Sequence, residues 1–189
     1  RPCIFEYIYF SRPDSIVKNT SFYEYRKRLG AELARENNTL SDLIIPVPDS
    51  GVPAAIGYSE QIKKNVELGI IRNHYVGRTF IEPTQQIRSL GVKLKHNVNK
   101  SLIKNKSIIL IDDSLVRGTT SVKIIKMLYE AGAKEVHLRI ACPPIKYPDY
   151  YGVDTPNENE LLASKLDLEG MRKYIDAKTL KFLSLEGLY

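Results

Sequence analysis

Short apolar runs alternate along the chain with longer stretches in which apolar residues recur every three or four positions. The runs are typical of buried strands, and the periodic stretches are typical of amphipathic helices. Their alternation predicts an α/β domain in which helices flank a central, mostly parallel sheet. The expected strands are residues 4–10, 43–47, 68–71, 108–111, 136–142 and 180–185. The expected helices are residues 21–36, 52–65, 122–131, 158–164 and 168–175.

Residues 75–105 break this pattern, because they are polar and basic and show no strong hydrophobic period. A stretch of that length inside a compact domain is either a functional loop or an element that the pattern fails to reveal. The net charge of +6 is located in the same region, since no acidic residue lies between Glu82 and Asp112. The basic residues there are Arg88, Lys93, Lys95, Lys100, Lys104 and Lys106. A local basic segment suits a polyanionic ligand, although a solvated loop with no partner explains the charge equally well.

Length and composition are those of one globular domain of 189 residues. No apolar run approaches the roughly 20 residues that span a bilayer, so we expect no membrane association. The two cysteines, Cys3 and Cys142, cannot build a disulfide framework, which is consistent with a reducing cytoplasm. Nucleic acid is a poor candidate ligand, because Phe80 is the only aromatic residue between Val76 and Ile111 that could stack on a base. Because the chain begins at Arg1 and not at Met, we expect a fragment or a processed product.

The segment 108–121 combines the residue types of an anion site. An apolar strand delivers two adjacent acids, Asp112 and Asp113, to the edge of the sheet where open α/β sheets bind their ligands. A short loop ends in Gly118, and the hydroxyl residues 119–121 then open a helix, whose N–H groups and dipole favour phosphate. The acids would repel a phosphate unless a Mg²⁺ ion or the hydroxyls of a sugar lay between them.

Simpler explanations exist for each part of this segment. Thr119, Thr120 and Ser121 alone would be ordinary helix caps, and paired acids are common at strand ends. These explanations do not account for the occurrence of the paired acids, the glycine and the hydroxyl residues together in one strand–loop–helix unit. The sequence contains no GxGxxG, GxxxxGK[ST] or GxSxG pattern, which disfavours nicotinamide cofactors, a P-loop and a nucleophile elbow.

Residues 108–121 resemble the signature with which type I phosphoribosyltransferases bind 5-phosphoribosyl-1-pyrophosphate (PRPP). Further blocks narrow the resemblance to the amidophosphoribosyltransferase family, which opens de novo purine synthesis. These blocks are residues 2–7, 11–15, 73–81, 112–121 and 184–188, in the family's order. The resemblance implies the type I phosphoribosyltransferase fold over residues 1–189, with a long flexible loop that folds over bound PRPP.

The resemblance also implies roles for individual residues. Asp112 and Asp113 would hold the ribose hydroxyls and take part in Mg²⁺ binding, with Ser50 near the metal. Asp49, Ser50 and Gly51 match the pyrophosphate loop. The 5′-phosphate loop would include Ser114, Val116, Arg117, Gly118, Thr119 and Thr120. Catalytic contacts from the flexible loop would fall to Tyr75, Arg78, Arg88 and Lys93.

The activity implied is transfer of the 5-phosphoribosyl group from PRPP to ammonia, with release of pyrophosphate. An oxocarbenium-like state at C1 requires no covalent nucleophile, so catalysis would rest on positioning, charge stabilisation and exclusion of water. Two other functions stay open. One is a PRPP- or nucleotide-binding regulatory domain, although no helix-turn-helix is evident. The other is a salvage phosphoribosyltransferase, which would need a hood for a free base.

Two departures from the family limit these expectations. The family's glutaminase domain has no counterpart here, so we expect ammonia-dependent activity at most. Many relatives hold an iron–sulfur cluster with four cysteines; Cys3 matches one ligand, but Asp149 stands where another is expected. Because such clusters need a full set of thiolates, we predict no cluster and assign Cys3 and Cys142 to the core. The family further implies a cytoplasmic homo-oligomer inhibited by purine nucleotides, with no nucleic-acid partner.

Overall fold

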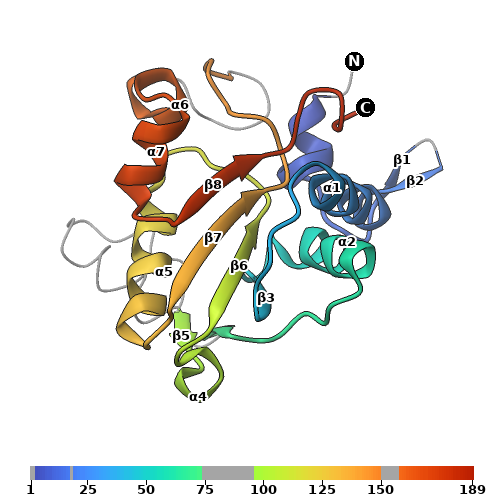
Figure 1. The fold of residues 1–189 in the computed structure, drawn as a ribbon. Coiled ribbons are helices and arrows are strands. Elements are labelled where there is room, and N and C mark those ends of the chain that lie inside the picture. Colours follow the sequence, from blue (N-terminus) through green and yellow to red (C-terminus); the bar gives the residue numbers. More distant parts are fainter. Residues whose placement is uncertain (1–2, 18, 74–95, 150–157) are drawn as a thin grey trace.

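Four parallel strands form the central sheet of the computed structural model, which describes residues 3–17, 19–73, 96–149 and 158–189. In spatial order they are β3 (Leu43–Pro46), β6 (Ser107–Asp112), β7 (Glu135–Ile140) and β8 (Thr179–Phe182) (Figure 1). Every residue of β6 is buried, as expected for the inner strand of a parallel sheet covered on both faces. The prediction of a mostly parallel α/β sheet is confirmed.

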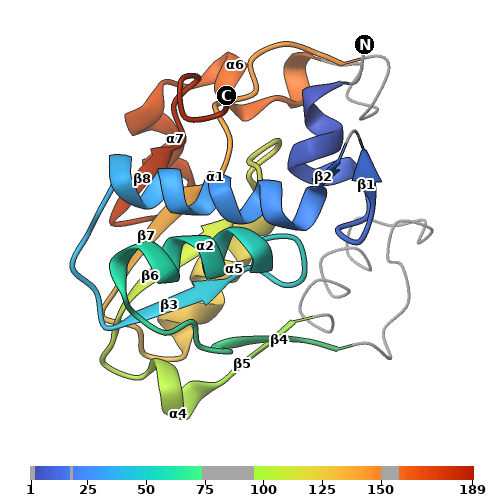
Figure 2. The same ribbon diagram turned by 90° about the vertical axis from the view of Figure 1, so that its right-hand side faces the viewer.

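Helices cover both faces of this sheet. α1 (Phe22–Glu36) and α2 (Val52–Ile62) lie together on one face. The other face carries α5 (Thr119–Glu130), α6 (Leu162–Lys165) and α7 (Leu168–Ile175) (Figures 1 and 2). Because helices bury both faces of the sheet, the sequences of its strands are continuously apolar and do not alternate between apolar and polar residues.

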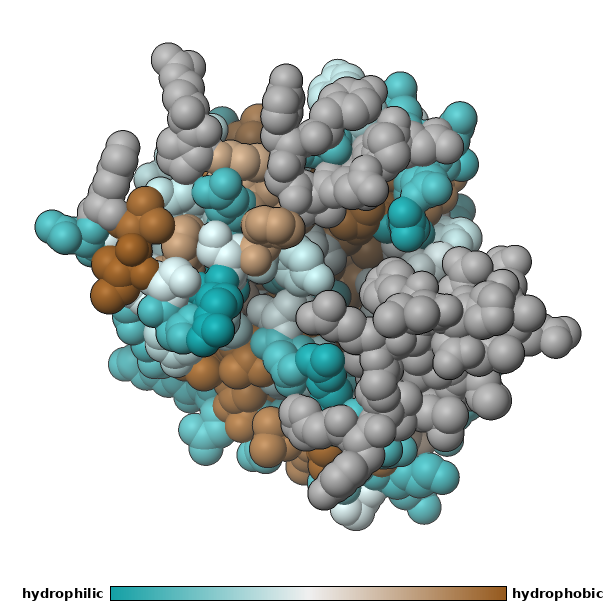
Figure 3. Space-filling model, turned by 180° about the vertical axis from the view of Figure 1, so that it is seen from behind, coloured by the Kyte–Doolittle hydropathy of each residue, from teal (hydrophilic) through white to brown (hydrophobic). Residues whose placement is uncertain are grey.

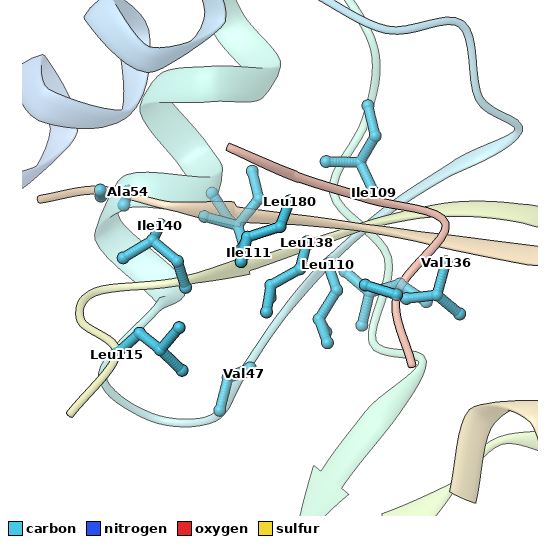
Figure 4. Close-up of a cluster of buried hydrophobic side chains, with 14 of the residues drawn as sticks. Val47, Ala54, Ile109, Leu110, Ile111, Leu115, Val136, Leu138, Ile140 and Leu180 are labelled. Atoms are coloured by element: carbon cyan, nitrogen blue, oxygen red, sulfur yellow. The ribbon is translucent and has the colours of Figure 1, made fainter. Parts of the chain in front are cut away.

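The core follows the pleat of the sheet, because successive side chains of a strand point to opposite faces. Ile109 and Ile111 of β6 lie on the α2 side, and Leu110 lies on the opposite side beside Leu138 of β7 (Figure 4). All four side chains are fully buried. The most apolar segment of the sequence therefore forms the centre of the molecule.

α1 shows how local sequence fixes a helix. The hydroxyl of Ser21 accepts a hydrogen bond of 3.4 Å from the Glu24 backbone N–H and caps the helix. Phe22, Leu29 and Leu33 form its buried stripe, as their spacing predicts. One charged residue, Arg26, also lies on this buried face, with 5% of its surface exposed.

Smaller elements surround the central layers. Two short antiparallel pairs are formed by β1 (Ile16–Val17) with β2 (Thr20–Ser21) and by β4 (Ile70–Arg72) with β5 (His96–Val98). Three short helical turns are η1 (Glu6–Phe10), α4 (Lys100–Ile103) and η3 (Glu158–Glu160). On the described part of the face seen in Figure 3, hydrophilic and hydrophobic side chains are interspersed. No helix in the described ranges is both long and apolar enough to cross a membrane.

The predicted strand at residues 4–10 is wrong, because this stretch is helical and includes the wide turn η1. A short apolar run does not distinguish a strand from a buried helical turn. A tertiary contact with Arg26 favours the helical conformation. Its guanidinium donates hydrogen bonds to the carbonyl oxygens of Tyr7 (2.9 Å), Ser11 (2.7 Å) and Glu6 (3.4 Å). These bonds stabilise the carbonyl end of a helical turn.

Other expected elements are confirmed with shifted boundaries. α2 ends at Ile62, three residues early, because Lys63 adopts the left-handed region (φ 55°). The expected helix at 158–164 is divided into η3 and α6. β5 and α4 were hidden in the region 75–105, whose remaining part, up to residue 95, lies outside the described residues, and with it the expected flexible loop.

Candidate active site

The site lies where the carboxyl ends of β3 and β6 meet. The two strands are parallel neighbours, and the Val47 N–H donates to the Ile111 carbonyl oxygen at 2.8 Å, so the loops that follow them begin side by side. Gly51 is essential to this approach, since a Cβ atom there would lie 2.4 Å from the Ile111 carbonyl oxygen. The sheet thus brings the predicted residues Asp49–Gly51 against Asp112 and Asp113, although some sixty positions separate them in sequence.

The two acids are buried and only partly satisfied. Asp112 and Asp113 are 7% and 6% exposed. Asp112 Oδ1 accepts hydrogen bonds from the Asp113 backbone N–H (2.9 Å) and the Ser50 hydroxyl (3.4 Å). Asp113 Oδ1 accepts one from the Ser114 hydroxyl (3.2 Å), while Asp113 Oδ2 is buried without a hydrogen-bond partner among the described residues. A buried carboxylate oxygen without a partner is costly, so this atom points to a ligand.

Burial raises the pKa of both acids. For Asp112 the pKa lies well above its ordinary range, first because of burial and then because of the neighbouring charge of Asp113. For Asp113 burial again dominates, and the nearby positive charge of Arg26 favours the ionised form to a smaller degree. A cation or a set of hydroxyl donors between the carboxylates would therefore stabilise their ionised forms.

The loop after the acids leads into α5 through Gly118, which has a positive φ of 75° that favours glycine. Among the described residues no side chain caps the start of α5. Thr119 and Thr120 are exposed in its first turn, while Ser121 is buried. The N–H groups and hydroxyls of this first turn are therefore open to an anion, with the helix dipole adding to its attraction.

A narrow crevice, without room for a water molecule, adjoins Asp113. Three polar side chains line it, from Arg26, Ser50 and Asp113. Its apolar walls come from Ile8, Leu29, Ala54 and Ala141. The N-terminal turn and α1 thus contribute directly to the surroundings of the site.

Two salt bridges hold the site loops from outside. Asp49 pairs with Arg72 at the end of β4, and Arg117 pairs with Glu160 of η3. Sequence reasoning missed Arg26, Arg72 and Glu160. For Arg26 a signal existed, namely a charged residue on the buried stripe of a predicted helix, whereas Arg72 and Glu160 gave none.

The other predicted site residues divide into two groups. Asp49–Gly51 and residues 112–120 come together at the sheet edge. The expected catalytic residues Tyr75, Arg78, Arg88 and Lys93 lie outside the described residues.

The donor set fits Mg²⁺, which prefers oxygen ligands and is often bound by one or two carboxylates together with substrate phosphates. Asp112, Asp113 and Ser50 supply such oxygens, and Asp113 Oδ2, which has no hydrogen-bond partner in the described part of the chain, is available for one bond. Within the described ranges, no three His, Cys, Asp or Glu side chains gather as a metal-binding group. The residues present therefore suit a metal held jointly with a ligand.

The cysteines differ in their surroundings. Cys142 is buried beside the acids, and burial raises the pKa of its thiol strongly. Cys3 is only half-buried, so its assignment to the core is wrong; its thiol lies 3.5 Å from Asp149 Oδ2. Asp149, which stands where the family resemblance led us to expect a cysteine, therefore lies beside Cys3.

A parallel α/β sheet with paired acids after its central strand, followed by a glycine-ended loop and a helix N-terminus, defines the type I phosphoribosyltransferase fold. Residues 14–155 match the phosphoribosyl transferase domain family, and the chain belongs to that family.

Curated relatives and solved structures agree with this assignment. An amidophosphoribosyltransferase of Rhizobium etli is 57% identical over 190 aligned positions, which include the whole chain and 38% of the relative. That of Bacillus subtilis is 50% identical over 98% of the chain and 39% of the relative. The solved glutamine PRPP amidotransferase from B. subtilis, complexed with ADP and GMP, superposes with a TM-score of 0.89 at 49% identity, covering 98% of the chain and 41% of that structure. The chain thus spans about two fifths of the length of these relatives.

Proposed function

We propose that this chain transfers the 5-phosphoribosyl group of PRPP to ammonia, giving 5-phosphoribosylamine and pyrophosphate. The observation that carries the proposal is the buried acid pair, with Asp113 Oδ2 unpartnered among the described residues, next to an uncapped helix N-terminus. Identity of 50% and more to amidophosphoribosyltransferases supports this reaction over others of the same fold.

PRPP binding is divided between the two loops. The backbone N–H groups of residues 114–118 and the hydroxyls of Thr119 and Thr120 bind the 5′-phosphate, as at other helix N-termini. Asp112 and Asp113 accept hydrogen bonds from the ribose hydroxyls. Asp49, Ser50 and Gly51 bind the pyrophosphate, and Gly51 lets this loop lie against Asp112.

Mg²⁺ would be held by Ser50, Asp112 and Asp113 together with PRPP oxygens, and it would supply charge neutralisation of the pyrophosphate group. Both carboxylates are buried, and in such surroundings their attraction to a metal ion would be stronger than in water.

Catalysis rests on positioning and charge stabilisation. The reaction breaks the C1–O bond to pyrophosphate and forms a C1–N bond to ammonia through an oxocarbenium-like state, so no covalent nucleophile is needed. The thiol of Cys142, which follows β7 and is buried beside the acids, stays protonated because burial raises its pKa. Tyr75, Arg78, Arg88 and Lys93 stabilise the departing pyrophosphate and exclude water.

The partners proposed for the whole protein follow from the relatives. A glutaminase domain of the same polypeptide would supply ammonia, and purine nucleotides would inhibit, since the B. subtilis structure is a complex with ADP and GMP. A second structural relative is titled an allosteric regulatory enzyme of purine biosynthesis. We further propose a cytoplasmic homo-oligomer without an iron–sulfur cluster.

Turnover with different acceptors tests the proposal. The chain is incubated with PRPP, Mg²⁺ and ammonium, and pyrophosphate release is followed, with free purine and pyrimidine bases as competing acceptors. Release that depends on ammonium supports the proposal. Release that depends on a base would indicate a salvage enzyme, and PRPP binding without release under any condition would indicate a regulatory domain.

A further inference from the structure

The loop at residues 114–118 is contacted from outside the sheet by residues 158–165, which we call the brace. The brace comprises η3 and α6, which lie beside α7 on the α5 side of the sheet (Figure 1). It is itself tightly folded, because the Ser164 hydroxyl lies 2.8 Å from the carbonyl oxygens of both Glu158 and Leu161, which share its single proton. Leu161 and Leu162 anchor it in the core.

Three contacts join the brace and its neighbour α7 to the loop. The Leu162 backbone N–H donates to the Val116 carbonyl oxygen at 2.8 Å. Gly118 packs beneath Leu162 and Tyr174, since a Cβ atom at Gly118 would lie 2.8 Å and 3.2 Å from their side chains. The third contact is the salt bridge between the Arg117 guanidinium and the Glu160 carboxylate, which joins two half-exposed side chains.

Arg117 would otherwise be the obvious cation for the phosphate, since it stands in the loop just before α5. In the structure its charge is already engaged by Glu160. Backbone N–H groups and the hydroxyls of α5 are enough to bind a phosphate, so the loop does not require the guanidinium as a direct ligand. A pair at this position instead restricts the conformation of the loop.

We propose that Glu160 is a positioning residue for the 5′-phosphate loop, acting through Arg117 to hold the loop in its binding conformation. This inference rests on the proposed function. The affinity for a ligand falls in proportion to the fraction of protein in the competent conformation. A half-exposed ion pair shifts such an equilibrium by about fivefold at most, which sets the size of the effect.

The direction in which phosphate affinity changes when the Glu160 charge is removed distinguishes a positioning role from a purely electrostatic one. If Glu160 were only a nearby negative charge, its removal would strengthen phosphate binding. If Glu160 orders the loop, its removal weakens binding in spite of the more favourable charge.

Calorimetric titration of the 189-residue chain tests this inference with two probes. Ribose 5-phosphate carries only the 5′-phosphate, and pyrophosphate with Mg²⁺ reports on the other half of the site. For Glu160→Gln we expect about threefold to fivefold weaker ribose 5-phosphate binding and unchanged pyrophosphate binding. Because the two residues act as one unit, Arg117→Met and the double variant should show the same loss.

Glu169→Gln is the matched control, since it breaks the exposed pair of Glu169 with Arg172 on α7, away from the loop. It should leave both probes unaffected, and thermal unfolding should show that Glu160→Gln stays folded. Tighter or unchanged ribose 5-phosphate binding in Glu160→Gln would overturn the inference, as would losses that multiply in the double variant. Failure of the unmodified chain to bind either probe would instead contradict the proposed function.

Discussion

The Ser50 hydroxyl donates a hydrogen bond of 3.4 Å to Asp112 Oδ1, joining residues that lie 62 positions apart. The bond links the loop after β3 to the loop after β6, so the proposed pyrophosphate loop and the proposed ribose-binding acids form one surface. Parallel pairing of the two strands makes this contact possible, because it places both carboxyl ends at one edge of the sheet.

Gly51→Ala should separate these loops. The added Cβ would meet the backbone carbonyl of Ile111 at 2.4 Å, and a backbone atom in the centre of the sheet cannot move away easily. We expect a loss of about 1–3 kcal/mol in the free energy of unfolding, with PRPP affinity reduced by a larger factor than in Ser50→Ala. Urea denaturation and PRPP titration measure both effects. Wild-type stability and affinity in Gly51→Ala would show that the close approach is not required.

Asp112→Asn should stabilise the ligand-free chain at neutral pH while impairing PRPP binding. The ionised carboxylate is buried beside Asp113, so removing its charge should raise the free energy of unfolding by about 1–2 kcal/mol. Such a gain in stability with loss of function is typical of a binding site. A loss of stability at pH 7 would contradict this account of the acid pair.

The pH dependence of that difference follows from the sign of the pKa shift. The pKa of Asp112 is raised in the folded chain, mainly by burial. Its contribution to stability is therefore present in full below its unfolded pKa and is lost as the pH rises through the folded pKa. The stability advantage of Asp112→Asn over the wild type should therefore appear above about pH 4, the ordinary pKa of an aspartate, and grow as the pH rises toward the folded pKa. Urea denaturation of both proteins across this range measures it, with the exposed Glu186→Gln variant as control.

Arg26→Met should disrupt the N-terminal turn. The substitution removes the donor of the Tyr7 and Ser11 carbonyl oxygens, while the Glu6 carbonyl oxygen keeps the Ser11 backbone N–H as its donor. Met fills much of the same volume as Arg26. Leaving buried acceptors unsatisfied costs about 1–3 kcal/mol each, so we expect a loss of at least about 2 kcal/mol in the free energy of unfolding. Amide hydrogen exchange should increase first in residues 6–11. Unchanged exchange there would show that Arg26 does not hold the turn.

The sequence predicted the centre of this molecule better than its edges. β6 and the acids after it were recognisable because a buried parallel strand is continuously apolar, and the loop after it contains the residue types of a phosphate site. The turn at residues 6–10 was misassigned, because its conformation depends on Arg26, some twenty positions away. β5 was missed because its three residues carry no apolar alternation and gain their structure from pairing with β4.

The same distinction applies to the site. Asp49–Gly51, Asp112 and Asp113 were assigned from motif and resemblance, and the sheet brings them together. Glu160 could not be assigned, because its significance comes only from the contact with Arg117 across the fold. Residues that hold a binding loop from outside carry no local pattern, so only the tertiary structure reveals them.

Calorimetric titration of PRPP in Mg²⁺ into the wild-type chain and into the Asp112→Asn/Asp113→Asn variant tests the central claim most directly. The variant keeps the volume of both side chains and removes the charges that would face the metal and the ribose. The proposed site predicts measurable binding to the wild type and an affinity lower by at least about tenfold in the variant, since hydrogen bonds to charged groups contribute about 1.5–3 kcal/mol each. Equal affinity in the two proteins would contradict the assignment of the acid pair to the PRPP site.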